Sequence, residues 1–157
     1  MSVTAVDFSA PASEASLEAL ASRLRERNFE VVIVDDGAAA KAEVLSRVPE
    51  GSQVYAGKSK TLEDAGIFQE FMDNEKYDFI RRRLMKMDRN TQRDDMRRAS
   101  AAPDFMVNSA HAVTEAGQIV ITSASGSQIG PIASGAGKLI LVIGSQKLVP
   151  DLETAFR

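Results

Sequence analysis

The chain has no cysteine, no tryptophan and a single histidine, His111. The absence of cysteine excludes disulfides, thiolate nucleophiles and cysteine-bound zinc or iron–sulfur clusters within the chain. A lone histidine also excludes a metal site built from several histidine ligands. We therefore expect no metal site, and the sequence offers no ligand set that indicates a bound cofactor.

Long apolar runs and a large charge excess are also missing. No apolar stretch reaches the roughly 18 residues that a membrane span needs. Residues 1–10 lack the basic region and apolar core of a signal peptide, so we expect a cytoplasmic protein. The net charge of −3 gives no global reason to expect nucleic acid as a partner. The 157 residues are enough for one domain, residues 1–157, with a substantial core.

Apolar periodicity predicts helices and strands that alternate along the chain. Helices are expected at residues 13–27, with Ser13 as N-cap, and at 38–47, 62–72, 91–101 and 151–157. Strands are expected at 31–34, 53–56, 77–80, 105–108, 118–122 and 138–143, with the first and last buried. Thr91 and Asp94 have the spacing of a capping box. Residues 81–88 give no clear pattern.

This alternation predicts an α/β fold, a three-layer α/β/α Rossmann-like arrangement with a mainly parallel sheet. Ligands of such sheets bind beyond the carboxyl ends of the strands. The rule selects four loops rich in glycine, serine or charge: 57–61, 109–117, 123–130 and 144–147.

The loop after the strand at 53–56 is the strongest candidate for an anion site. Free N–H groups at the start of the next helix favour negative charge, which Gly57 lets approach the backbone. Lys58 and Lys60 would add charge, and Ser59 and Thr61 would add hydroxyl donors. The alternative is an ordinary strand-to-helix turn, with Thr61 as N-cap and both lysines in solvent.

A second candidate is the turn that contains Glu115. Its carboxylate could act as a general base or as a nucleophile that forms an acyl intermediate. The alternative is a hairpin turn with a solvated glutamate and Gly117 at positive φ. His111 could share a proton with Glu115 or be structural. Asn108 and Ser109, at a predicted strand end, are candidate hydrogen-bond donors to a ligand.

Two further motifs give weaker evidence of a binding site. Residues 135–138 lack the spacing of a nucleotide P-loop, and no dinucleotide fingerprint follows the first strand. The basic stretch from Arg81 to Arg98 is interpreted first as solvated helix faces and second as a surface for an acidic partner. It contains no aromatic residue to stack on bases, which argues against single-stranded nucleic acid.

Several motifs together resemble the lactate utilization domain (LUD) family. They run from about residue 29 to the end of the chain: Pro49-Glu50-Gly51-Ser52, Gly57-x-Ser59-x-Thr61-Leu62-Glu63, His111-Ala112-Val113-Thr114-Glu115, Gly137-Lys138-Leu139-Ile140-Leu141 and Gln146-Lys147-Leu148-Val149-Pro150. The resemblance implies the fold shared by ribose-phosphate isomerases, glucosamine-phosphate deaminases and CoA transferases (NagB/RpiA/CoA transferase-like). It implies a role in oxidising lactate to pyruvate beside iron–sulfur partner subunits. It also implies that the C-terminal tail is short relative to the family.

The leading hypothesis is therefore an accessory subunit of a lactate-utilization system. It would bind a small carboxylate or phosphate between the Gly57 loop and the turn at 114–117, with Gly117 beside the ligand and Glu115 as base or acceptor. The alternatives are a stand-alone isomerase or CoA-transferase-like enzyme that uses Glu115, and a non-catalytic interaction module. A homodimer is possible, and neither nucleic acid nor a membrane is expected.

Overall fold

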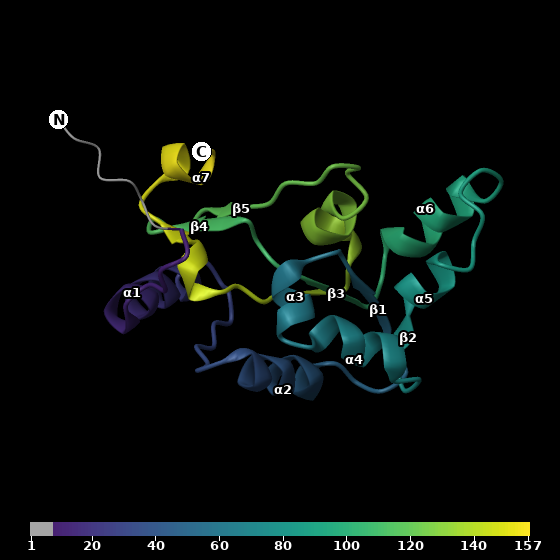
Figure 1. The fold of residues 1–157 in the computed structure, drawn as a ribbon, viewed down its shortest axis with the longest axis horizontal. Coiled ribbons are helices and arrows are strands. Elements are labelled where there is room, and N and C mark those ends of the chain that lie inside the picture. Colours follow the sequence, from purple (N-terminus) through teal and green to yellow (C-terminus); the bar gives the residue numbers. More distant parts are fainter. Residues whose placement is uncertain (1–7) are drawn as a thin grey trace. The chain divides into compact units, whose positions relative to one another are not determined.

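The computed structural model describes residues 8–157, and the chain divides into two compact units, which are described separately. We call residues 34–109 and 123–142 the sheet unit. The hairpin unit comprises the described residues up to 33, together with 110–122 and 143–157. Figure 1 labels the elements of both units.

The sheet unit is built on a four-stranded parallel sheet. Its strands are β1 (Gln53–Ala56), β2 (Asp78–Phe79), β3 (Phe105–Asn108) and β6 (Lys138–Leu141), in the order β2-β1-β3-β6. Every neighbouring pair is parallel, and β1 lies between β2 and β3. The prediction of an α/β fold with a mainly parallel sheet is confirmed.

Helices cover both faces of this sheet. On one face lie α2 (Gly37–Arg47), α3 (Lys60–Asp64) and α4 (Ile67–Asp73), and on the other lie α5 (Ile80–Leu84), α6 (Arg93–Ala101) and the π-helix η1 (Pro131–Gly135). Successive strand residues point to opposite faces. Val54 and Val107 therefore pack against the first helical layer, whereas Tyr55 and Met106 pack against the second. These are the three layers that the sequence predicts.

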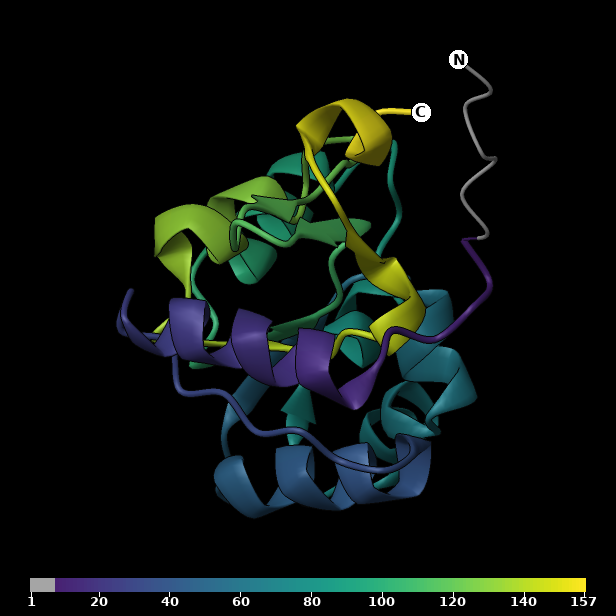
Figure 2. The same ribbon diagram turned by 90° about the vertical axis from the view of Figure 1, so that its left-hand side faces the viewer.

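Contacts within the first helical layer hold its helices to one another. In two perpendicular views α2 lies beside α4 (Figures 1 and 2), and an ion pair of 2.6 Å joins Lys41 of α2 to Glu70 of α4. A Cβ on Gly37 would come within 3.3 Å of Ala65, so glycine lets α2 approach the α3–α4 connection closely. Phe68, Phe71 and Phe79 form edge and stacked ring contacts in this core.

The hairpin unit contains α1 (Glu14–Arg25), the short helices η2 (Ser145–Lys147) and α7 (Leu152–Ala155), and a second sheet. That sheet has the order β5-β4-β7, where β4 is Ala112–Thr114, β5 is Ile119–Val120 and β7 is Leu148–Val149. The β4–β5 pair is antiparallel and the β4–β7 pair is parallel. Arg27, just after α1, donates a hydrogen bond of 2.9 Å to the carbonyl of Gly117.

Most predicted elements are present, with shorter bounds. Ser13 caps α1 as expected, because its hydroxyl accepts from the backbone N–H of Ser16 at 3.2 Å. Helices occur at the other predicted positions, and the unassigned residues 81–88 contain most of α5. No helix within residues 8–157 combines the length and apolar character needed to cross a bilayer.

Four predictions were wrong in detail. Residues 31–34 form no strand, and Val32 to Val34 are exposed rather than buried. The single helix at 62–72 is two helices, because Gly66 between them has φ +67. Thr91 does not cap α6, which begins after Gln92, and instead donates to Asp88 at 3.1 Å. The strand at 138–143 exists as β6 at the sheet edge, with Lys138 exposed and the rest half-buried.

Candidate functional site

The carboxyl ends of β1 and β3 form the position in the sheet unit best suited to a ligand. After β1 the chain passes to β2 on one side, and it then crosses back to β3 on the other side of β1. Strand order therefore reverses at β1, and the loops after β1 and β3 diverge there. Open parallel sheets bind ligands at such switch points.

Polar side chains gather here around the backbone of Gly57. We call this group the strand-end cluster: Gly57, Thr61, Asn108, Ser109 and Gln128. Asn108 Nδ2 donates to Gln128 Oε1 at 3.1 Å, and Ser109 Oγ lies 3.4 Å from Thr61 Oγ1. Asn108 is 3% exposed and Ser109 5% exposed. Buried polar groups of this kind are costly unless hydrogen-bonded, so their gathering at a strand end is a specific feature.

Gly57 lets two amide side chains approach the backbone at the end of β1. A Cβ at this position would lie 2.2 Å from Gln128 Oε1 and 2.8 Å from Asn108 Oδ1. Any side chain would therefore push these amides away. The sequence places glycine where the backbone must remain accessible to polar atoms.

The residues after Gly57 lie at the start of a short helix. Ser59 is the N-cap of α3, but its hydroxyl makes no capping hydrogen bond. Lys58 is exposed, while Lys60 pairs with Asp64 one turn on, and that hydrogen bond raises the pKa of Lys60. Lys58 and the Ser59 hydroxyl are thus the groups of this loop best placed to meet an anion from solvent.

Glu115 belongs to the hairpin unit, in the turn between β4 and β5. Gly117 donates its N–H to the carbonyl of Thr114 at 2.8 Å and has φ +81, as expected for a hairpin turn. The Glu115 carbonyl accepts from Arg23 at 2.7 Å, and its N–H donates to Val149 at 2.9 Å. The Glu115 carboxylate is exposed at a depression of about 300 Å³ lined also by Arg23, Ala116 and Pro150.

His111 and Lys147 also lie in the hairpin unit, and each makes a backbone contact. His111 Nδ1 accepts from the N–H of Thr122 at 3.2 Å. At about 3.3 Å per extended residue, His111 stands roughly 13 Å from Glu115, at the opposite end of β4. Lys147 Nζ donates to the carbonyl of Ala110 at 2.8 Å, and burial lowers its pKa below 10.5.

The structure brings together Gly57, Thr61 and Asn108, three of the residues predicted to bind a ligand, and Lys58 and Ser59 lie in the same loop. Glu115 and Gly117 belong to the other unit. Gln128 was not singled out by the sequence, although its loop was. A glutamine 20 residues from Asn108 carries no local signal, and only the fold shows the contact. Within residues 8–157, no three His, Asp or Glu side chains gather as a metal site requires.

Comparison with known proteins gives one match. The model of the LUD domain family matches residues 17–157, which is nearly the whole chain. The match begins in α1, upstream of the first motif that carried the resemblance. Neither the curated proteins nor the solved structures include a significant match.

Proposed function

Because the chain belongs to the LUD domain family, which is associated with lactate utilization, we propose that it is an accessory subunit of a lactate-utilization system. It would support the oxidation of lactate to pyruvate. The order and spacing of its motifs, which resemble those of lactate utilization protein C, support this role. We propose a cytoplasmic location for this role.

The proposed ligand is a small carboxylate at the strand-end cluster. The observation that carries this proposal is the hydrogen-bonded pair of the buried Asn108 and the half-buried Gln128 at the switch point, whose amide oxygens occupy the space that a Cβ on Gly57 would fill. Lys58 would supply positive charge, and the hydroxyls of Ser59 and Thr61 would donate hydrogen bonds. This site uses residues of the sheet unit alone. A charge-assisted hydrogen bond is about twice as strong as a neutral one, which favours an ionised carboxylate.

Partner subunits would carry the electrons. Oxidation of lactate to pyruvate removes two electrons and two protons, so an acceptor is required. The chain contains no cysteine to ligate an iron–sulfur cluster, and therefore the clusters that the family resemblance implies would lie in other subunits. The present chain would bind the small acid and present it to them.

Calorimetric titration of the purified chain with lactate, pyruvate and inorganic phosphate tests the proposal. Lactate or pyruvate should bind, and a ligand at about a hundred times its dissociation constant should stabilise the protein by about 2.7 kcal/mol. Replacing Lys58 and Ser59 together with Ala should abolish binding without changing the unfolding midpoint of the free protein.

The matched control is the double variant Lys138→Ala with Ser134→Ala, which removes the same two residue types elsewhere in the sheet unit. Both side chains are exposed, and Lys138 lies at the amino end of β6. Binding that survives the Lys58 and Ser59 replacement would contradict the site. Tight binding of phosphate without lactate would contradict the substrate class.

A second candidate function uses Glu115, because its carboxylate is exposed beside a depression that Arg23 also lines. A CoA-transferase-like enzyme would attack an acyl-CoA thioester with this carboxylate, forming an acyl anhydride and releasing the CoA thiolate. Mass spectrometry after incubation with acetyl-CoA would detect the acylated chain. Glu115→Gln should lose the adduct, and an adduct that persists in this variant would exclude Glu115.

A further inference from the structure

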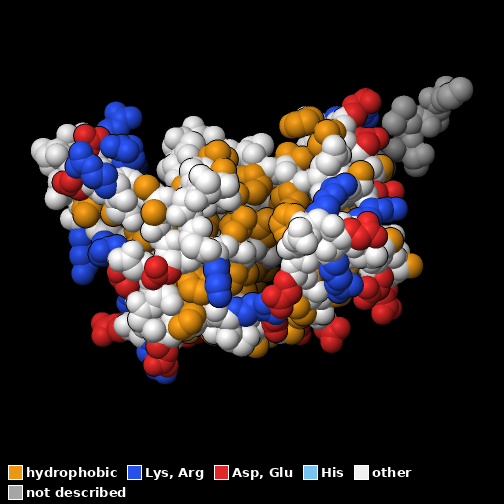
Figure 3. Space-filling view, turned by 180° about the vertical axis from the view of Figure 1, so that it is seen from behind, with side chains coloured by type: hydrophobic (Ala, Val, Ile, Leu, Met, Phe, Trp, Pro, Cys, Tyr) orange, Lys and Arg blue, Asp and Glu red, His pale blue; other side chains and the backbone are white. Residues whose placement is uncertain are grey.

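Basic side chains gather on α5, α6 and the loop between them, a segment that we call the basic arm (residues 80–101). Figure 3 shows basic side chains in blue on the left of the view, with some acidic side chains in red among them. The arm contains eight basic and three acidic residues, whereas the whole chain has three more acidic than basic residues. A positive surface on a mildly acidic protein favours a negatively charged partner.

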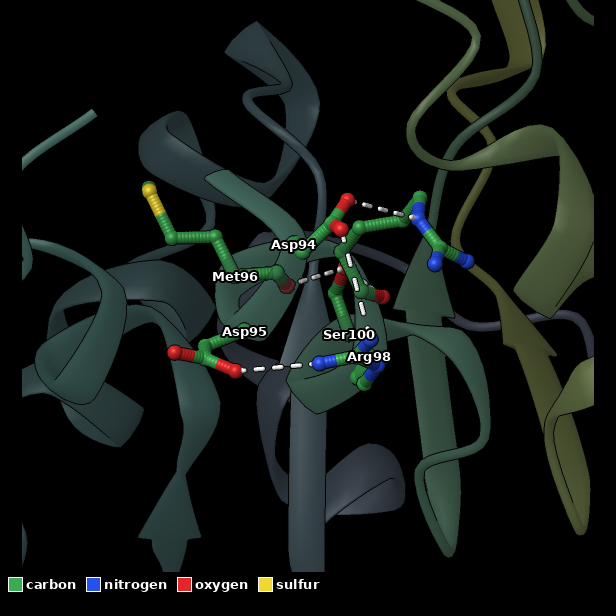
Figure 4. Close-up of polar contacts among 6 residues, drawn as sticks. Asp94, Asp95, Met96, Arg98 and Ser100 are labelled. Carbon is green, nitrogen blue, oxygen red and sulfur yellow. Dashed lines mark hydrogen bonds and ion pairs between the residues drawn. The ribbon is translucent and has the colours of Figure 1, made fainter. Parts of the chain in front are cut away.

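Part of this positive charge is paired with aspartates within α6. Figure 4 shows Asp95 paired with Arg98 at 3.2 Å, and Asp94 lies 3.7 Å from Arg97. Ser100 donates to the carbonyl of Met96 in the same helix at 3.1 Å. These exposed pairs lie along one helix and contribute little to stability. They account for two of the eight basic residues.

Four other basic residues have no ion pair within the described part of the chain. They are Arg81, Lys86, Arg89 and Arg93, and all except the half-buried Arg81 are exposed. Of the remaining two, Arg83 lies 3.5 Å from Asp78, and Arg82 donates to the backbone carbonyls of Asn74 and Tyr77. The positive charge that the arm presents to solvent therefore comes mainly from its loop and from the first residue of α6.

The arm rises beside a depression of about 470 Å³. Arg82, Arg83 and Lys86 line it, and so do Lys76 and the acidic residues Glu75 and Asp78, so basic residues outnumber acidic ones four to two. Since Gly51 and Tyr77, which also line it, precede the parallel strands β1 and β2, the depression is at the amino edge of the sheet. The strand-end cluster is at the carboxyl edge. The arm is therefore a separate surface from the proposed carboxylate site.

The composition of the arm favours protein over nucleic acid. Seven of its eight basic residues are arginine, and it holds three of the six methionines, with Met85 71% exposed. Arginine and methionine are enriched in protein interfaces while lysine is depleted, and arginine binds carboxylates through two parallel hydrogen bonds. The arm has no aromatic residue to stack on bases.

We propose that the basic arm and the depression at its foot dock an acidic segment of a partner protein. Glutamate and aspartate side chains of that segment would meet Arg89 and Arg93 on the arm and Lys86 at the depression. Met85 would cover apolar surface between them, since methionine adapts its shape to an uneven contact.

Fluorescence anisotropy with a labelled oligoglutamate peptide and the full chain tests the proposal. Reversing both charges with Arg89→Glu and Arg93→Glu should weaken binding about tenfold or more, because attraction becomes repulsion. Replacing the same two residues with lysine keeps the charge but loses the paired hydrogen bonds, so it should weaken binding less than the charge reversal does. Binding should weaken as salt rises, since exposed charges are screened beyond about 10 Å at 0.1 M ionic strength.

Two measurements locate the peptide. The control Lys138→Glu with Arg157→Glu changes net charge equally outside the arm and should leave affinity within about twofold. Carbodiimide coupling of the peptide should form an amide at Lys86 in preference to Lys58 and Lys138. Equal loss in the control, coupling spread over all lysines, or salt-independent binding would overturn the proposal. So would tighter binding of duplex RNA or phosphatidylserine vesicles through the same arginines.

Discussion

Three features decide the chemistry of the strand-end cluster: the lack of a Cβ at Gly57, the Asn108 side-chain amide and the Gln128 side-chain amide. The two amides are hydrogen-bonded at 3.1 Å, with Asn108 buried and Gln128 half-buried. The hydrogen bond between the two amides requires that no atom occupy the Cβ position of Gly57. The site is thus sensitive to a single added carbon atom.

Gly57→Ala should destabilise the protein by about 1–2 kcal/mol, because the new Cβ separates Asn108 from Gln128 and leaves buried polar atoms without partners. Urea unfolding measures the change. Gly130→Ala is the matched control: Gly130 has a helical φ of −57 and nothing within 4 Å of its Cβ position. The control should be neutral or stabilising by up to about 1 kcal/mol. Equal effects at the two glycines would contradict this account.

Lys147 gives the hairpin unit a pH dependence. Burial lowers the pKa of Lys147 in the folded protein below the ordinary value of 10.5, which applies to the unfolded chain. At pH values between the folded and the unfolded pKa, the unfolded chain therefore binds more protons than the folded protein. The free energy of unfolding should therefore rise with pH across that window. Lys147→Met cannot titrate and should lack this slope.

The measurement is urea unfolding of both proteins at several alkaline pH values. Their difference cancels the other titrating groups. Loss of the hydrogen bond to the Ala110 carbonyl shifts the variant's stability by a constant, so only the slope is informative. A difference that is flat or falls as pH rises would show that Lys147 is not held in a desolvating environment.

At the residue scale the sequence predicted which loop residues lie at the end of β1, because glycine, hydroxyl residues and lysine after a strand follow a known physical logic. It also predicted that Asn108 lies at the end of a strand. It could not predict that Gln128 contacts Asn108, since that contact depends on how residues 123–130 return to β3. Nor could it place Glu115 and Gly117, which the fold assigns to another unit.

At the element scale, periodicity predicted the positions of α1, α2, β1 and β3 well. The clearest errors come from local features that override it. The β-branched residues at 31–34 have the composition of a strand, but no neighbouring strand pairs with them. β4 and β7 were missed because segments of two or three residues carry too little pattern.

Gly66 divides what the sequence presents as one helix. Its φ of +67 is left-handed, and nothing lies within 4 Å of its Cβ position. Gly66→Ala should therefore cost about 1–2 kcal/mol through backbone strain alone. Gly66→Asn should cost less, because asparagine tolerates this conformation.

Urea unfolding of the two variants, with circular dichroism as the probe, checks this expectation. Alanine has the highest helix propensity, so a continuous helix over residues 60–73 would be stabilised by it. An alanine variant more stable than the parent would show that the helix does not break at Gly66.

At the scale of the whole molecule, alternation of strands and helices was enough to predict the three-layer sheet unit. The mixed sheet of the hairpin unit was not predicted. Its strands come from segments widely separated in sequence, β4 and β5 near residue 115 and β7 near residue 148. Only the sheet unit is encoded by nearly contiguous sequence, interrupted by residues 110–122.

This difference predicts which part of the chain folds by itself. A fragment of residues 34–142 retains all four parallel strands and both helical layers, with residues 110–122 as a long connection. The entropic cost of closing a loop grows only slowly with its length. The fragment should therefore unfold cooperatively in urea.

A fragment of residues 34–137 is the matched test, because it removes β6 and the residues after it. β3 would keep β1 but lose its β6 partner from Phe105 to Asn108, and the core would lose Ile140 on one face of the sheet and Leu139 on the other. An unpaired strand edge and two opened cores should abolish cooperative unfolding and promote aggregation. If both fragments unfold alike and without cooperativity, the sheet unit depends on the hairpin unit for its stability. If both unfold cooperatively, β6 is dispensable and the core is held by β1, β2 and β3 with their helices.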